Sequence, residues 1–251
     1  MKPQPAAAIA AASAATEALL DLARTGIHPD TPLAFHADQL NLMHDMTSLL
    51  ADALQTEARL AAAALTLPLG TEGVPLREEA DHVQARLARA GVLADVAADD
   101  LDHALRETRK RAAATTQDIT VIPDGGPMYR RARIAAHRMA DLADALIAAP
   151  GQPAAEPLAV LTGHRQITEA LTTAAGHLAH ACTQLTGPIT GAWNPARVGA
   201  GPGRNSRATL VTAPLASAAE MLGKARRLVF DAQGQITSVR ELQHLVPAVT
   251  Q

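Results

Sequence analysis

Histidines close to carboxylates are the residues of this chain whose types and spacing could bind a metal. Three pairs have the right separation on a helix, namely Glu79/His82, Asp100/His103 and His177/His180. Metal ligands in carboxylate-bridged helical bundles must project inward between facing helices. A helical wheel instead places these histidines, and His137, away from the apolar stripe of their own helices. We therefore expect these histidines to face solvent, and we expect no metal and no cofactor.

Glu57 and Gln39 differ from these histidines, because both fall inside the apolar stripe of a long helix expected over 32–67. A buried carboxylate needs a partner or a raised pKa. The ordinary expectation is that Glu57 pairs with an arginine at the edge of the fold. The alternative is an enzyme or ligand-binding bundle with a core site around Glu57, completed by His36 or His164, the histidines nearest the apolar arcs.

The candidates for a nucleophile and for a phosphate-binding loop are weaker than the polar residues in the apolar stripe. Cys182 lies on the apolar face of a helix expected over 156–187, where a thiol acts as a small hydrophobe and not as a nucleophile. The segment 198–203 superficially resembles the glycine-rich turn of flavin-binding Rossmann domains. That motif needs a preceding strand, and no parallel-sheet pattern is present. Arg204 and Arg207 remain candidates for anion binding, because this loop leads into a helix N-terminus.

The composition indicates helices that pack closely. Hydrophobic residues make up 48% of the 251 residues and aromatic residues only 2%, so alanine and leucine supply most of the apolar surface. Alanine is the best helix former, whereas a β-sandwich or barrel would be rich in β-branched and aromatic residues. We expect an all-α antiparallel bundle of about six to eight helices without significant sheet. We find no sustained heptads and no repeat of fixed period in the sequence.

Apolar periodicity and glycine or proline stops predict where the helices lie. The expected ranges are 6–25, 32–67, 76–90, 93–116, 127–149, 156–187, 207–229 and a last helix from 237 or 238 to 247. Gly91 is interpreted as a stop between two helices, and residues 230–236 as a turn. We expect residues 1–30 to form an alanine-rich, partly mobile arm or helix and residues 31–251 to form the bundle, with a candidate sub-boundary at 150–155.

Charge is distributed unevenly along the chain. Residues 1–105 hold 15 acids and 6 bases, a net charge of −9, whereas residues 106–138 have a net charge of +5. We call the bases of the second segment the basic cluster: Arg106, Arg109, Lys110, Arg111, Arg130, Arg131, Arg133 and Arg138. The helix dipole favours bases at a helix end and disfavours them at a helix start, such as Arg130 and Arg133. An acidic surface of the same fold, a partner or a nucleic-acid phosphate should compensate them.

The remaining features limit the location of the protein. One cysteine cannot form an intramolecular disulfide, which favours the cytoplasm. The alanine-rich start has only Ile9 as a large apolar residue, so we do not expect a signal peptide. No run of 18 large apolar residues is present, and we expect no transmembrane helix and no membrane partner.

The sequence therefore leaves three functions open. The leading hypothesis is a non-enzymatic structural or interaction protein that self-associates or docks a partner protein, through helix faces and the basic cluster. The second is the core site around Glu57. The third is nucleic-acid binding by the basic cluster, which the small number of aromatic residues and the net charge of −3 do not favour.

Overall fold

Six helices make up the described part of the chain. The computed structural model describes residues 4–24, 33–66, 76–114, 126–148, 157–192 and 205–245. Their helices are α1 (Gln4–Ala23), α2 (Leu33–Thr66), α3 (Arg77–Ala114), α4 (Gly126–Ile147), α5 (Pro157–Ala192) and α6 (Asn205–Leu245). No strand occurs in these ranges, which confirms the predicted all-α class. None of the six helices is long and apolar enough to cross a membrane.

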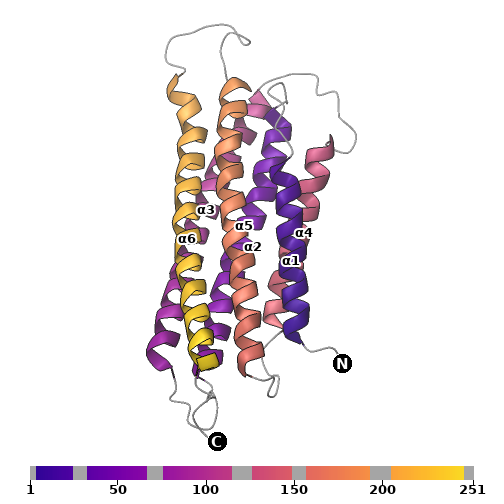
Figure 1. The fold of residues 1–251 in the computed structure, drawn as a ribbon. Coiled ribbons are helices and arrows are strands. Elements are labelled where there is room, and N and C mark those ends of the chain that lie inside the picture. The colour runs from indigo at the N-terminus through magenta and orange to yellow at the C-terminus, as the bar shows by residue number, and fades with distance from the viewer. Residues whose placement is uncertain are drawn as a thin grey trace, which may run out of the picture.

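The six helices stand side by side in two layers of three (Figure 1). One layer holds α3, α2 and α4 in that order, and the other holds α6, α5 and α1. Successive helices run in opposite directions along one long axis. Because α2 and α5 are the middle helices of their layers and also pack against each other, each of them contacts three other helices. Side chains that point from α2 toward α5 are therefore enclosed on all sides.

Alternating spacings of three and four residues separate the buried side chains along the outer helices α3 and α6. In α3 the series is Ala80, Val83, Leu87, Ala90, Ala94, Ala97, Leu101, Ala104 and Thr108. In α6 it is Val211, Leu215, Ala218, Leu222, Ala225, Val229, Ala232, Ile236 and Val239. This is the heptad spacing of coiled-coil packing. The expectation of no sustained heptads is wrong, because alanine fills many core positions and is also common outside them, which hides the period.

Gly91 lies inside one continuous helix, α3, where two helices were predicted. A Cβ atom at Gly91 would lie 2.9 Å from Cγ of Gln55 and 3.3 Å from the carbonyl oxygen of Ala51, both on α2. The glycine therefore allows α2 and α3 to approach closely and does not end a helix. Sequence alone cannot separate these two uses of glycine, since the second depends on the neighbouring helix.

The turn predicted over 230–236 is also wrong, because α6 continues without interruption to Leu245. Ala232 and Ile236 occupy buried heptad positions on either side of Gly234. Burial of these side chains outweighs the low helix propensity of a single glycine, which is about 1 kcal/mol. In the same way α5 extends past Gly187 and through Pro188, and Ile189 is buried there.

The alanine-rich segment at the N-terminus contains α1, which packs against α4 and α5. Its buried side chains follow the same spacing and are Ala8, Ala12, Ala15, Leu19 and Leu22. Within the described residues this segment therefore belongs to the packed core. The candidate sub-boundary at 150–155 lies outside the described residues.

Replacing Gly91 with leucine should destabilise the fold by about 2 kcal/mol, because overpacking a filled contact costs about 1–3 kcal/mol. The matched control is Gly234→Ala, since a Cβ there would meet nothing within 4 Å. It should stabilise the fold by about 0.5–1 kcal/mol through helix propensity alone. Chemical denaturation of both variants measures these changes. A Gly91→Leu variant as stable as the wild type would contradict the close approach of α2 and α3.

Candidate functional site

A carboxylate–imidazole pair joins the two middle helices of the bundle. The Nδ1 atom of His164 on α5 donates to Oε1 of Glu57 on α2 over 2.7 Å. The side chain of Glu57 is fully buried, and 12% of the His164 side chain is exposed. Both residues occupy core heptad positions, since Glu57 follows Leu54 by three residues and His164 follows Leu161 by three. The pair therefore replaces an apolar contact in the α2–α5 seam, toward the end of α2 and near the start of α5.

The partner of Glu57 is a histidine and not the arginine expected from the sequence. The nearest arginine along the helix, Arg59, is exposed and donates from Nη2 to Oγ1 of Thr56 over 3.4 Å. A histidine fits the seam because its ring is smaller than an arginine side chain and can lie between closely packed helices. The alternative prediction named His36 or His164 as the residue beside Glu57, and the structure places His164 there.

Opposing influences set the pKa of His164. Burial is the largest of them and lowers the pKa, while the charge of Glu57 and its hydrogen bond raise it. The net result is a pKa above the ordinary value of 6.5. The folded chain therefore holds the proton on His164 more tightly than an exposed histidine does.

One oxygen of the pair has no hydrogen-bond partner in the described part of the chain. Oε2 of Glu57 is buried and accepts no hydrogen bond there. A buried polar atom in this state is costly, and such atoms are enriched at sites that bind or react. The pair could accept or release a proton, because His164 keeps some contact with solvent. No group of three or more metal-ligating side chains is present among the described residues.

Gln39 does not join this pair. It lies eighteen residues before Glu57 on α2, or about 27 Å at the rise of an α-helix. Its Oε1 accepts a hydrogen bond from Nδ1 of His36 over 3.3 Å. Both residues are buried, so this second polar pair lies in the core near the start of α2. Glu57 and Gln39 therefore belong to two separate polar pairs in the core and not to one site.

Four buried threonines form hydrogen bonds within their own helices. The hydroxyl groups of Thr47, Thr108, Thr168 and Thr172 each donate to the carbonyl oxygen four residues earlier. Cys182 is fully buried, and burial raises the pKa of its thiol to about 12. A thiol with such a pKa does not form the reactive thiolate at neutral pH.

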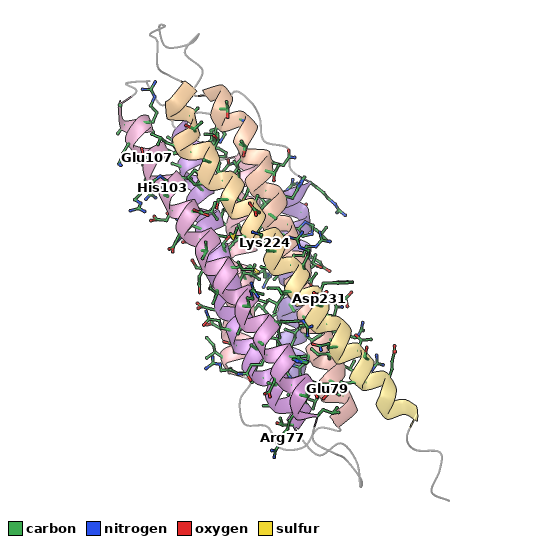
Figure 2. All side chains as sticks on the ribbon, turned by 90° about the vertical axis from the view of Figure 1, so that its left-hand side faces the viewer. Arg77, Glu79, His103, Glu107, Lys224 and Asp231 are labelled. Carbon is green, nitrogen blue, oxygen red and sulfur yellow. The ribbon has the colours of Figure 1, made fainter. Side chains whose placement is uncertain are left out.

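The histidine pairs suggested by helical spacing lie on the surface for the most part. His82, His103, His137 and His180 are exposed. Figure 2 shows His103 at the outer edge of the bundle on α3. His177 is only half-buried, and its Nε2 atom is enclosed without a hydrogen-bond partner among the described residues.

The basic cluster is divided between two helices that are not neighbours. Its two parts lie apart, because α3 and α4 lie on opposite sides of α2. Local partners hold several of the bases: Arg106 with Asp102, Lys110 with Glu107, Arg109 with Asn41, Arg131 with Asp21 and Arg138 with Asp141. An acidic residue at the end of α1 thus compensates Arg131 at the start of α4.

The other members of the predicted anion-binding set differ in exposure. Arg130 and Arg133 are exposed and form no ion pair with another described residue. Arg111 is half-buried near the end of α3. Arg204 lies outside the described residues, and the side chain of Arg207 is not described. Among the described members of this set, the structure brings together no anion site.

Replacing His164 with leucine should destabilise the fold by about 3 kcal/mol, because removing one partner leaves the other buried and unpaired. Glu57→Leu should cost less, since a neutral histidine that reaches solvent is easier to accommodate. The double variant Glu57→Leu/His164→Leu should regain most of the loss. Chemical denaturation of the four proteins gives the coupling energy between the two positions. Additive losses would show that the two side chains do not interact.

The stability of the wild-type chain should fall as the pH rises above 6.5, the ordinary value for histidine. Below this pH both folded and unfolded chains carry the proton, and the contribution of His164 is fully present. Above it the unfolded chain loses its proton first, so stability declines until the pH passes the raised pKa of the folded chain. Thermal unfolding from pH 6 to 9 measures the slope. His164→Gln should reduce this slope, whereas the exposed control His82→Gln should not.

Comparison with known proteins does not assign this chain to a family. No family model, no curated protein and no solved structure matches the chain. The function must therefore be inferred from the contacts, burial and charges of the described residues.

Proposed function

We propose that this protein is a non-enzymatic helical interaction protein of the cytoplasm, which presents a helix face to a partner protein or to a second copy of itself. The observation that supports this function is a second apolar face on α3, on the side opposite its buried heptads. Large apolar side chains rarely line up on a solvent-exposed helix face without a contact to make.

Val92, Asp95, Val96 and Asp99 form this face, which we call the α3 strip. Val92 is 56% exposed and Val96 is 42% exposed. The four residues follow the spacing i, i+3, i+4 and i+7, so they lie in one continuous line on the helix surface. Val92 and Val96 form one i, i+4 row, and Asp95 and Asp99 form a second row beside it, so the strip offers an apolar contact with charge along one side.

The two carboxylates of the strip lie close to a third carboxylate, that of Asp52 on α2. Burial and the charges of Asp52 on α2 and Asp99 raise the pKa of Asp95, while a hydrogen bond from Gln55 lowers it. Nε2 of Gln55 donates to Oδ2 of Asp95 over 3.1 Å. No cation forms an ion pair with Asp52, Asp95 or Asp99 among the described residues. A positively charged partner would therefore relieve the repulsion among them.

The basic cluster is a weaker candidate for docking than the strip. Most of its described bases already contact an acid or a polar side chain of the same chain. Its two parts also stand on either side of α2 and offer no continuous surface. For the same reason we do not favour nucleic-acid binding, which would require many bases along one face.

The core site around Glu57 is the second candidate function. The observation in its favour is the buried Oε2 atom of Glu57, which lacks a hydrogen-bond partner among the described residues. The double variant Glu57→Leu/His164→Leu distinguishes the two candidates. A core site requires the pair and would be lost, whereas docking through α3 requires only that the fold persists.

A photo-reactive amino acid in place of Val96 should yield a covalent protein adduct when the full chain is irradiated in cells. The matched control is the same amino acid at His137, which lies on α4 and has a side chain 77% exposed. We expect an adduct from position 96 at several times the yield from position 137, measured by gel shift and mass spectrometry. Equal or absent adducts at both positions would contradict docking through the α3 strip.

A further inference from the structure

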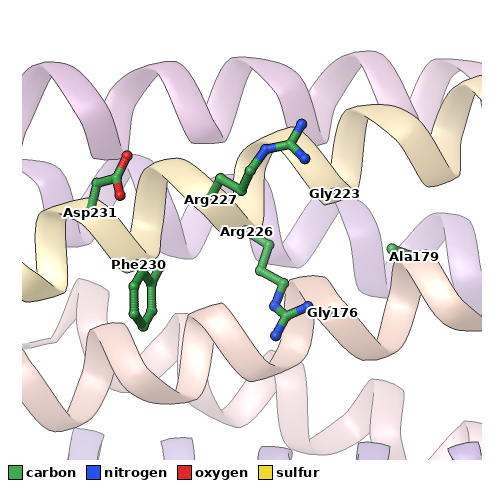
Figure 3. Close-up of a pocket in the computed structure, with 7 residues that line it drawn as sticks. All are labelled: Gly176, Ala179, Gly223, Arg226, Arg227, Phe230 and Asp231. Carbon is green, nitrogen blue, oxygen red and sulfur yellow. The ribbon is translucent and has the colours of Figure 1, made fainter.

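A groove with a volume of about 550 Å³ runs between α5 and α6 on the layer opposite the α3 strip. Its lining residues are Gly176 and Ala179 of α5 with Gly223, Arg226, Arg227, Phe230 and Asp231 of α6. We call it the α5–α6 groove. Figure 3 shows Arg226 and Phe230 pointing from α6 toward α5, while Arg227 and Asp231 point away from it. This groove was not predicted from the sequence, because residues 230–236 were interpreted as a turn.

Small residues and one exposed aromatic ring shape this groove. Gly176 leaves room for the side chain of Arg226, whose Cδ and Nε atoms would lie 3.2 Å and 3.3 Å from a Cβ at that position. Phe230 is 64% exposed, the largest exposure among the large hydrophobic residues described. An aromatic ring beside a floor of small residues can seat a branched aliphatic side chain.

Cations dominate the charge of the groove. Two of its lining residues are arginines and one is an aspartate. Neither Arg226 nor Arg227 forms an ion pair with another described residue, although Lys224 nearby is held by Glu220 over 2.7 Å. Burial and the charges of His180 and Arg226 lower the pKa of His177 at the border of the groove. Like charges therefore repel one another here, as carboxylates do beside the α3 strip.

We infer that the α5–α6 groove binds the α3 strip of a second copy of this chain. This inference rests on the proposed function and names the partner of the strip. The charge and the apolar parts of the two surfaces complement each other. Arg226 and Arg227 meet Asp95 and Asp99, while Val92 and Val96 lie against Phe230. Each contact relieves repulsion on both surfaces and removes apolar area from water.

The position of the two surfaces determines the kind of assembly. The α3 strip belongs to one layer of the molecule and the α5–α6 groove to the other. The contact is therefore heterologous, with different surfaces of the two copies facing each other. Such contacts generate rings or open stacks, and not closed symmetric dimers. The assembly should grow beyond two copies as the protein concentration rises.

Charge reversals on either surface test this inference. Arg226→Glu/Arg227→Glu alters the groove, and Asp95→Lys/Asp99→Lys alters the strip. Each variant alone should self-associate about a hundredfold more weakly than the wild type, because like charges then face each other. An equimolar mixture of the two variants should associate again, since each surface meets a complementary one. Light scattering during size exclusion over a range of concentrations measures the assembly, and circular dichroism verifies that each variant is folded.

Arg130→Glu/Arg133→Glu is the matched control, because it makes the same charge change on exposed arginines of α4. It should associate as the wild type does. A monomeric wild type, an unaffected groove or strip variant, or a mixture that stays monomeric would overturn the inference. A wild type that stays monomeric but forms an adduct with another protein from position 96 would overturn only the inference. Loss of all adducts would overturn the proposed function as well.

Discussion

The packing of α2 against α5 is the contact on which the rest of this bundle depends. These helices are the middle members of the two layers, and every other helix packs against at least one of them. The pair of Glu57 and His164 lies in their seam at 2.7 Å. A slip of one helical turn, about 5.4 Å, would separate the two groups and leave both buried without a partner. We infer that the pair fixes the register of α2 against α5, as single polar residues do in coiled coils.

Alanine at many core heptad positions gives this bundle closely packed helices. Small side chains let the helices approach closely, and Gly91 extends this to the contact of α3 with α2. In the core, Glu57 and Gln39 each pair with a histidine, and the hydroxyl groups of four threonines bond within their own helices. Oε2 of the fully buried Glu57 has no hydrogen-bond partner among the described residues. A function in binding at the surface, through the α3 strip and the α5–α6 groove, therefore has stronger support than a reaction in the core.

The sequence predicted the features that depend on one helix at a time. The scarcity of aromatic residues indicated the all-α class, and the stripe of the long helix indicated the core position of Glu57. Features that depend on two helices were missed. Gly91 and the segment 230–236 were interpreted from local propensity, which packing against a neighbour outweighs. The arrangement of α3 and α4 on opposite sides of α2, and the groove around Arg226, follow from a topology that periodicity does not determine.

The central claim is that two surfaces on opposite layers of this chain recognise each other. A single chain carrying all four reversals, Arg226→Glu, Arg227→Glu, Asp95→Lys and Asp99→Lys, tests it most directly. Both surfaces then change sign together, so they remain complementary. Light scattering should show that this variant assembles to the same size as the wild type at the same concentration. A folded variant that remains monomeric where the wild type assembles would contradict the claim.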